Sequence, residues 1–313
     1  MTEKILVIKL SALGDFILAL GSMEAIRQKH PDADITLLTT KPFADIGQKS
    51  GYFNRVIITE RHKWHDFVGW LGLRKQLRGL EVSRVYDLQM NGRTATYYKY
   101  IFGGKVEWSG VVKGASHQYK NPEWRDMHAF ERHKEVLKEV GIEKIDMPST
   151  DWMTADISFY GLTKPYVVIV PGCAPTRLDK RWPPMRYAGL AKKLVRDGLH
   201  VVVLGTDAER DATEKIVKAC PEATDLTGQT SLFEVMAITR DAIATIGNDT
   251  GPVHMAAATG CPTMALFSSA SNPEHSAPRG HDVRIIQTDD LELLSVNEVW
   301  KEFQETLATK QAV

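Results

Sequence analysis

The stretch TIGNDTGPVHMAAA, residues 245–258, has the pattern of a buried strand, a short polar turn and a helix. The strand is an apolar run over residues 242–246, and the helix is rich in small residues. Asp249 or Thr250 can cap this helix, and Gly251 allows a ligand to approach the backbone closely. The first backbone N–H groups of a helix lack internal partners and carry partial positive charge, so the pattern predicts an anion site.

His254 favours a functional interpretation of this turn. It follows Gly251 by three residues, which places it one helical turn further on, near the same rim. Phosphate is the natural anion for such a site. The alternative is an ordinary capped helix after a strand, and the pattern alone does not decide between the two.

Two other loops of the second half also follow apolar strands. One, residues 171–183, contains Lys180, and the other, residues 205–209, ends on Glu209. The carboxyl ends of parallel strands meet at one rim of a sheet. The combined side chains match a nucleoside diphosphate, with Lys180 and the turn at Thr250–Gly251 for the phosphates and Glu209 for the ribose hydroxyls. There is no Walker A sequence, so ATP hydrolysis is not expected.

The first half of the chain begins with a similar unit. The run KILVIKL at 4–10 predicts a buried parallel strand, SALGD at 11–15 a turn, residues 16–28 a helix and 34–39 a second strand. The turn is not a G-x-G-x-x-G fingerprint, so no dinucleotide cofactor is predicted. Asp15 lies at the carboxyl edge of the first strand, where open α/β sheets bind ligands. The alternative is that Asp15 only caps the helix that follows.

These repeats predict an α/β protein with two Rossmann-like domains that face each other across a cleft. Residues 148–165 have little apolar periodicity and are expected to link the two domains. We place the domains at residues 1–155 and 156–313. The last helix has a fading apolar face and could pack back on the N-terminal domain.

Composition excludes some classes of function. The 313 residues suffice for two domains, and the formal net charge of zero argues against broad nucleic-acid binding. The three cysteines are far apart, which suits a reducing compartment, and neither they nor any Asp-x-Asp motif predicts a metal site. There is no signal-peptide pattern and no apolar run of roughly 20 residues. We therefore predict a cytoplasmic protein and leave attachment to a membrane surface open.

Two segments of the first half mix cationic and aromatic or polar residues. Residues 61–70, RHKWHDFVGW, lead into a helix with Arg74, Lys75 and Arg78. Such a face can bind an anionic partner or an anionic membrane surface. The more common alternative is a solvated helix whose aromatic residues lie in the core. Residues 111–125 are basic with little periodicity and predict a mobile loop, and long loops of this kind are often functional.

Three motifs together resemble glycosyltransferase family 9, the heptosyltransferases of lipopolysaccharide core synthesis. They are KLSALGDFILALGSMEAIR near the N-terminus, KRWP at 180–183 and GNDTGPVHMAAATGCP at 247–262. The similarity covers nearly the whole chain, and the D-T-G-P-x-H-x-A-A element is the most specific part. The resemblance implies the GT-B fold and an inverting transfer of heptose from ADP-heptose to a Kdo- or heptose-bearing lipid A acceptor, without a cofactor.

The resemblance also implies roles for individual residues. The catalytic base of the family falls on Asp15, and its pyrophosphate-binding lysine falls on Lys180, which stabilises the leaving diphosphate. The other donor ligands implied by the resemblance are Thr176, Glu209, Asp249, Thr250, Gly251 and His254. Basic residues of the N-terminal domain hold the acidic, lipid-linked acceptor in the family, and the candidates here are Arg61, Lys63, Lys113, Lys120 and Arg125.

This sequence departs from the family pattern in two places. Residues 268–275, SSASNPEH, stand where the family often has a glycine and a T-D-P-like turn, and this region borders the nucleotide and the donor sugar. Pro175 stands beside Thr176 where the family sometimes has a second hydroxyl. Two alternatives therefore stay open among enzymes, namely another nucleotide-sugar donor on the same fold and a nucleotide-sugar epimerase or hydrolase. A third is a binding protein that has lost turnover, against which the presence of both Asp15 and Lys180 argues.

Overall fold

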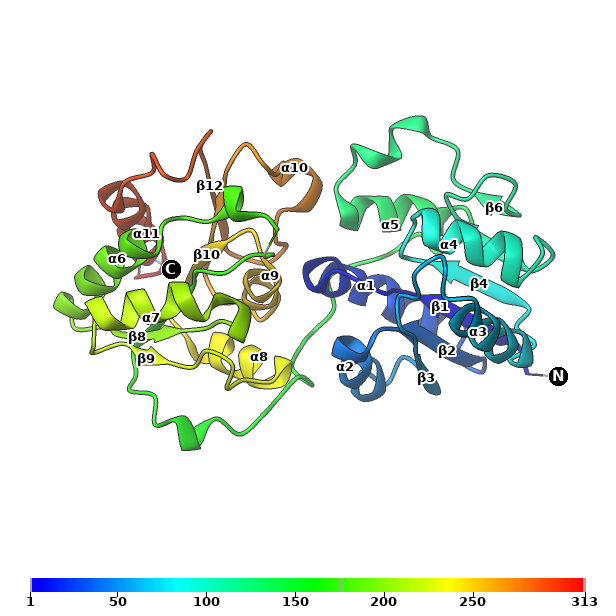
Figure 1. The fold of residues 1–313 in the computed structure, drawn as a ribbon, viewed down its shortest axis with the longest axis horizontal. Helices are drawn as coiled ribbons and strands as arrows, with labels where there is room; N and C mark the ends of the chain where they lie inside the picture. Colours follow the sequence, from blue (N-terminus) through cyan, green and yellow to red (C-terminus); the bar gives the residue numbers. More distant parts are fainter. Residues whose placement is uncertain (1, 175, 312–313) are drawn as a thin grey trace. The chain divides into compact units, whose positions relative to one another are not determined.

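The computed structural model describes residues 2–174 and 176–311, with the side chains of the last three of these residues left aside. The chain divides into two compact units, Met1–Pro148 and Ser149–Val313. The division falls seven residues before the end of the predicted N-terminal domain at residue 155. Each unit is described by itself below (Figure 1).

The first unit contains one parallel sheet whose strands, within the described residues, stand in the order β3-β2-β1-β4-β5-β6. The strands are β1 (Lys4–Ile8), β2 (Asp34–Thr39), β3 (Arg55–Ile58), β4 (Arg84–Asp87), β5 (Glu107–Gly110) and β6 (His117–Gln118). The helices are α1 (Leu13–Lys29), α2 (Ala44–Lys49), α3 (Phe67–Gly79), α4 (Gly92–Thr96) and α5 (Ala129–Lys138).

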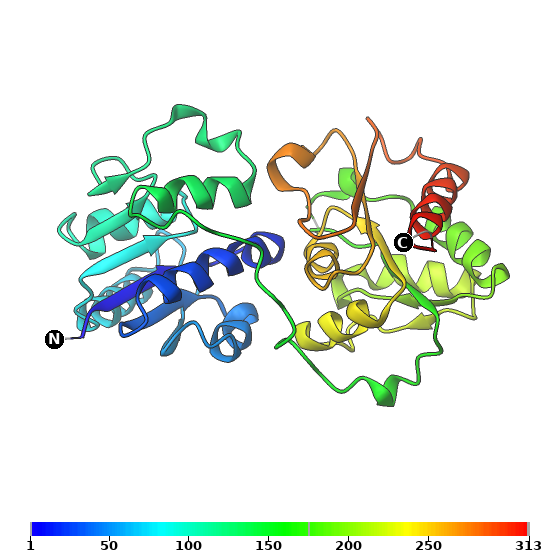
Figure 2. The same cartoon turned by 180° about the vertical axis from the view of Figure 1, so that it is seen from behind.

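Helices cover both faces of this sheet. Leu6 and Ile8 of β1 point into a core that α3 and a π-helical turn, Tyr97–Ile101, complete on one face. Helices α1 and α5 pack together on the other face, as the two views in Figures 1 and 2 show. Because both faces are covered, β1 is buried along almost its whole length, and this explains its continuous apolar sequence.

The second unit repeats this architecture with the strand order β12-β11-β10-β7-β8-β9, again counted over the described part of the chain. Its strands are β7 (Tyr166–Val170), β8 (His200–Val203), β9 (Thr224–Asp225), β10 (Ala244–Asn248), β11 (Thr263–Phe267) and β12 (Val283–Gln287). Its helices are α6 (Pro184–Arg196), α7 (Arg210–Ala219), α8 (Leu232–Asp241), α9 (Gly251–Ala258), α10 (Pro273–Ser276) and α11 (Val296–Gln311).

The last helix belongs to the second unit. Val299 and Phe303 of α11 are fully buried in the core that α6 and the strands of this unit form, and α11 packs against α6. This differs from the expectation that the helix packs back on the N-terminal domain.

Two segments differ from the loops predicted for them. Residues 149–153 are tied to the second unit, since Arg240 donates to the carbonyls of Thr150 (2.7 Å) and Met153 (3.1 Å). Residues 111–125, predicted as a mobile loop, contain the short strand β6 and a 3-10 turn, Pro122–Arg125. Asn121 caps that turn by accepting from the Glu123 N–H at 2.9 Å. Short elements of this kind carry too few residues for a periodicity to show in the sequence.

Candidate nucleotide and acceptor sites

The predicted anion turn lies at the carboxyl edge of the second sheet. Strands β7, β8, β10 and β11 are parallel, so the loops that follow them begin at the same edge. These are the loops that begin at residues 171, 204, 249 and 268. The prediction that loops of this half share one rim is confirmed by the strand pairing.

Asn248, the last residue of β10, fixes the loop after β7 to this edge. Its side chain is fully buried, and its Oδ1 accepts hydrogen bonds from the Trp182 N–H (3.0 Å) and the Tyr187 hydroxyl (2.9 Å). Its Nδ2 donates to the carbonyl of Pro171 at 2.7 Å. Both ends of the loop are therefore held by one amide. Sequence reasoning missed this residue, although a polar side chain at the end of a buried strand, next to Asp249, was a usable signal.

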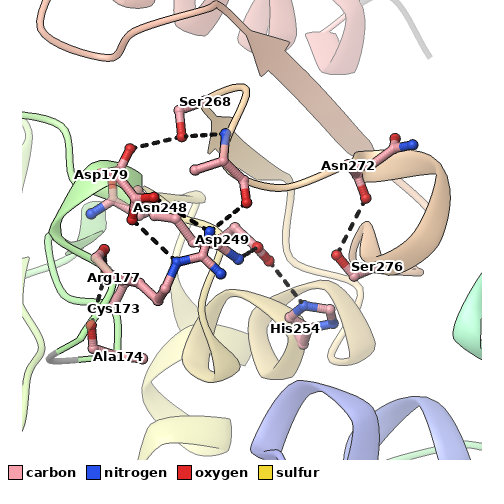
Figure 3. Close-up of polar contacts among 12 residues, drawn as sticks. Cys173, Ala174, Arg177, Asp179, Asn248, Asp249, His254, Ser268, Asn272 and Ser276 are labelled. Carbon is pink, nitrogen blue, oxygen red and sulfur yellow. Dashed lines mark hydrogen bonds and ion pairs between the residues drawn. The ribbon is translucent and has the colours of Figure 1, made fainter.

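Lys180, Asp249 and His254 form a compact charged cluster. The Lys180 Nζ donates to Asp249 Oδ2 at 2.7 Å. His254 Nε2 lies 3.8 Å from Asp249 Oδ1, and Figure 3 shows these two side chains facing each other. Burial alone would raise the pKa of Asp249, but the contacts with His254 and Lys180 outweigh it, so its pKa is lowered. The cluster thus combines an ionised carboxylate with a cation beside the N-terminus of α9.

The first turn of α9 is not capped by a side chain. Thr250 has extended backbone angles at the N-cap position, and its hydroxyl makes no capping hydrogen bond within the described part of the chain. Thr250 is thus the N-cap residue, as one of the two predicted alternatives, but without a side-chain capping hydrogen bond, and Asp249 faces Lys180 instead. The N–H of Gly251, as the first helical residue, has no intrahelical acceptor and can donate to an anion.

Glu209 is held by its neighbours rather than pointing freely into solvent. Its Oε2 accepts from the backbone N–H of Thr206 at 2.9 Å and from the Thr206 hydroxyl. A Cβ at Gly172 would lie only 2.5 Å from Glu209 Cγ, so the absence of a side chain there lets the glutamate fit. Glu209 Oε1 has no hydrogen bond to any described residue. Sequence reasoning did not single out Gly172.

The remaining residues of the loop after β7 fix its outer part. Ser268 donates to the carbonyl of Asp179 at 2.8 Å, and Arg177 donates to the carbonyl of Ala270 (Figure 3). Thr176, a predicted donor ligand, is exposed in this loop, while Pro175 lies outside the described residues. Residues 268–275, whose sequence differs from the family pattern, therefore support the loop that carries Lys180.

Asp15 lies in the first unit, in the first turn of α1 rather than in the turn before it. Its Oδ2 accepts from the Ala12 N–H at 3.3 Å, so the capping contact of the alternative interpretation is present. The preceding backbone is fixed as well, because the N–H groups of Leu10 and Ser11 both donate to Gln89 Oε1, at 2.7 and 3.0 Å. The carboxylate is only partly buried, and its second oxygen is not used in this capping contact.

Two cations that sequence reasoning did not select interact electrostatically with Asp15. Burial lowers the pKa of Lys9 and of Arg132, and the negative charge of Asp15 partly opposes both effects. Lys9 Nζ donates to the carbonyl of Leu88 at 3.1 Å. Lys9 was hidden in an apolar strand, but a lysine inside such a strand is itself unusual and could have been noticed.

The candidate acceptor residues of the first unit are all exposed, namely Arg61, Lys63, Lys113, Lys120 and Arg125. Arg61 and Arg125 each contact a neighbouring residue. The backbone carbonyl of Arg61 accepts from Arg93, which also donates to the carbonyl of His62. Arg125 lies over the ring of Trp124 at 4.3 Å, and Arg132 lies over the same ring at 5.3 Å.

Lys120 has a different setting from these two arginines. It lines a pocket of about 240 Å³ together with His117 and Glu139. The described candidates therefore lie in different settings, and Arg93 and Arg132 are neighbouring cations that the sequence did not single out.

Comparisons with known proteins agree with this architecture. A model of the family described as glycosyltransferase family 9 (heptosyltransferase) matches residues 70–301. Lipooligosaccharide heptosyltransferase 2 of Haemophilus influenzae is 33% identical over 144 residues, which cover 44% of this chain and 41% of that protein. Lipopolysaccharide core heptosyltransferase OpsX of the same species is 24% identical over 295 residues, which cover 88% and 82%.

A solved structure extends the likeness to the whole chain. The E. coli ADP-heptose LPS heptosyltransferase II has a TM-score of 0.79 with 22% identity, covering 98% of this chain and 99% of that one. This likeness confirms the predicted α/β fold of GT-B type. Among the described residues, no helix is both long and apolar enough to cross a membrane.

Proposed function

Because the chain belongs to glycosyltransferase family 9, the heptosyltransferases, we propose that it transfers a heptose from ADP-heptose to a lipid A acceptor that bears Kdo or heptose. Its relatives support this choice, since they are heptosyltransferases of lipopolysaccharide or lipooligosaccharide, and one structural relative is the E. coli ADP-heptose LPS heptosyltransferase II. The observation that carries the proposal is the cluster of Lys180 and Asp249 beside the N-terminus of α9.

The proposed donor site uses the rim of the second sheet. The diphosphate of ADP-heptose would take Lys180 from Asp249 and accept from the N–H groups at Thr250 and Gly251. Oε1 of Glu209 would accept from a ribose hydroxyl, with Thr176 near the phosphates. His254 would stay behind the turn against Asp249. Charge on the leaving diphosphate is stabilised by fixed donors, which is an effect of about 3–4 kcal/mol per donor in comparable sites.

The proposed reaction inverts the anomeric carbon. Asp15 takes the proton of an acceptor hydroxyl while the oxygen attacks the anomeric carbon from the face opposite ADP. The bond from this carbon to the diphosphate oxygen breaks, and ADP leaves with the electron pair. A well-placed general base contributes about 10²–10⁴ in rate. The mechanism requires that an acceptor bound by the first unit reaches a donor bound by the second.

The proposed acceptor is anionic and lipid-linked. The exposed cations of the first unit, together with Arg93 and Arg132, would bind its acidic sugars or phosphates. The donor is a water-soluble nucleotide sugar and the acceptor sits in a membrane. The proposal therefore places the protein in the cytoplasm, in peripheral contact with the inner membrane.

Calorimetric titration of the purified protein with ADP, UDP and GDP tests the donor assignment. We expect ADP to bind best, and Lys180→Ala to weaken ADP binding about tenfold or more, because a charge-assisted contact is lost. Lys218→Ala, an exposed lysine on α7, serves as the matched control and should leave binding unchanged. Preference for UDP or GDP would overturn the ADP-heptose assignment.

A second arm tests the reaction class. Incubation with ADP-heptose alone should leave the donor intact, and heptose transfer should require the lipid acceptor. Turnover of the donor without an acceptor would contradict transfer and favour an epimerase or hydrolase on the same fold.

A further inference from the structure

Helix α3 and its neighbouring segments carry a stripe of large apolar side chains that no described residue of the first unit covers. Trp64, Phe67, Val68, Leu71 and Tyr100 are between 60% and 82% exposed. The sequence interpretation that placed the aromatic residues of this segment in the core is therefore wrong for Trp64 and Phe67. Scattered exposed apolar residues are common on soluble proteins, but a contiguous group of large ones marks an interaction surface.

The spacing explains why the stripe faces outward. Leu73 and Leu77 of α3 are buried against the sheet and form its core-facing side. Phe67, Val68 and Leu71 follow the i, i+1, i+4 spacing of a second side of the same helix. An ordinary surface helix would carry polar residues there. This helix has two apolar sides, and only one of them packs inside the protein.

The exposed stripe borders a groove rather than a flat surface. The groove encloses about 580 Å³ and is lined mainly by the aromatic and aliphatic groups of α3 and of the π-helical turn Tyr97–Ile101. Arg74 lines it too and marks its polar border. We call the exposed side chains Trp64, Phe67, Val68, Leu71 and Tyr100 the α3 face.

The charges around the α3 face are almost all positive. Arg74, Lys75 and Arg78 are exposed on α3, a helix without acidic residues, and Lys63 and Lys99 flank it from the neighbouring segments. The carboxylate of Asp66, the N-cap residue of α3, is engaged: it accepts from the Gly69 N–H at 2.9 Å and contacts His62 Nδ1 at 2.7 Å. A partner for this face must therefore combine an apolar part with negative charge.

We propose that the α3 face docks on an anionic lipid surface, with its aromatic and aliphatic side chains in the interface and its lysines and arginines on the headgroups. Tryptophan and phenylalanine on one side and Lys/Arg on the flanks are the pattern by which helices lie in a membrane interface. A second copy of this chain fits less well, because two such faces would bring their positive charges together. The inference rests on the proposed function in one respect, namely that the acceptor is lipid-linked.

Co-sedimentation with lipid vesicles tests the proposal without donor or acceptor. We expect the wild-type protein to bind vesicles of equal parts phosphatidylglycerol and phosphatidylcholine, and to bind pure phosphatidylcholine vesicles much more weakly. The double variant Phe67→Ser/Leu71→Ser should lower partitioning into the anionic vesicles at least about tenfold, because two large apolar groups no longer enter the interface. The matched control is Leu293→Ser, which removes a leucine at least as exposed as Leu71 (73% against 63%) from the second unit and should bind as wild type.

A charge variant separates the two parts of the interaction. Arg74→Gln/Lys75→Gln should weaken binding to the anionic vesicles by about 25-fold, since each cation near such a surface contributes roughly fivefold. Binding of all variants to ADP, measured by calorimetry, should stay at the wild-type value, which shows that they fold. If the wild type itself did not bind ADP, this would count against the proposed function but would not change the meaning of the vesicle result.

Three outcomes of the vesicle experiments would overturn the proposal. They are no binding of the wild type to anionic vesicles, equal binding to neutral vesicles, and wild-type binding by the Phe67→Ser/Leu71→Ser variant. Sedimentation velocity completes the test. A wild-type dimer that becomes a monomer in that variant would show that a second copy occupies the face, and this too would overturn it.

Discussion

Lys180 and Asp249 form an ion pair of 2.7 Å although 69 residues separate them in the chain, and their side chains are only 17% and 9% exposed. The pair joins the loop after β7 to the turn before α9. The pair therefore holds the positive charge of Lys180 close to the N-terminus of helix α9. An anion that binds there must compete with Asp249 for this lysine.

This competition predicts the effect of Asp249→Asn. The variant should bind ADP about tenfold more tightly than the wild type, because Lys180 is released and a negative charge beside the diphosphate is removed. Heptose transfer should nevertheless slow, since the resemblance assigns Asp249 to the donor sugar as well. Calorimetry with ADP and initial rates with ADP-heptose measure the two effects.

Asp241→Asn is the control for Asp249→Asn, because Asp241 also pairs with a lysine, Lys164 at 2.7 Å, but on a different part of the unit. It should leave ADP affinity unchanged. If Asp249→Asn lost ADP binding as strongly as Lys180→Ala, the carboxylate would be a ligand-positioning group rather than a competitor.

Asp15→Asn separates catalysis from helix capping. We expect kcat to fall by about 10²–10⁴, because the amide cannot take the proton of the acceptor hydroxyl. The amide oxygen can still accept from the Ala12 N–H, so the free energy of unfolding should change by less than about 0.5 kcal/mol. ADP affinity should not change.

Rates, thermal unfolding and calorimetry on Asp15→Asn are compared with Asp32→Asn, an exposed aspartate in the loop before β2. Near-normal turnover of Asp15→Asn would exclude Asp15 as the base. Normal chemistry with a large loss of stability would leave it only the capping role.

The fold could be predicted from the sequence because buried parallel strands have a strong signature. The runs at β1, β7 and β10 are apolar and are each followed by a polar turn, which is enough to indicate repeated strand–helix units. The strand, turn and helix around Thr250–Gly251 were predictable for the same reason, since they depend only on residues adjacent in the chain; the anion site placed there stays a prediction. The sequence alone can indicate features that depend only on residues adjacent in the chain.

Other features depend on residues that meet only after folding. The Lys180–Asp249 pair and the hydrogen bonds of the Asn248 side chain join segments more than 60 residues apart, and no local pattern encodes them. The outward side of α3 was ambiguous for a different reason. A helix with two apolar sides has no unique core face in its sequence, and only the position of the sheet shows that Leu73 and Leu77 are inside.

A buried carboxyl of the first unit predicts a pH dependence of stability. Asp87 Oδ1 accepts from the N–H groups of Met90 (2.8 Å) and Gln89 (3.1 Å), while burial raises the pKa of Asp87 to about 6. Since the pKa in the folded state lies above the unfolded value, the protonated form favours folding. The stability that the protonated Asp87 carboxyl contributes is fully present below about pH 3.8, and it is lost as the pH rises through about 6.

Asp87→Asn should therefore be more stable than the wild type at pH 8, by up to about 3 kcal/mol, and similar to it at pH 4. Urea unfolding at the two pH values measures the difference, with the exposed Asp126→Asn as control. Equal stability of wild type and Asp87→Asn at pH 8 would show that Lys9 compensates the buried charge fully.

Gly172→Ala tests the proposed ribose contact of Glu209 without changing the glutamate. The new Cβ would lie 2.5 Å from Glu209 Cγ and 2.9 Å from its Cδ, so the side chain must leave its position against Thr206. Affinity for ADP should fall about tenfold, as expected for the loss of one hydrogen bond to a charged group. Affinity for pyrophosphate should stay the same, because Lys180 and the N-terminus of α9 do not move.

Calorimetry with both ligands distinguishes this local effect from a general one. Glu209→Ala should reproduce the ADP-specific loss, and Gly72→Ala, where a Cβ meets nothing within 4 Å, should bind both ligands like the wild type. A parallel loss of pyrophosphate binding in Gly172→Ala would mean that the whole loop after β7 has shifted. Wild-type affinity for ADP in both Gly172→Ala and Glu209→Ala would remove Glu209 from the nucleotide site.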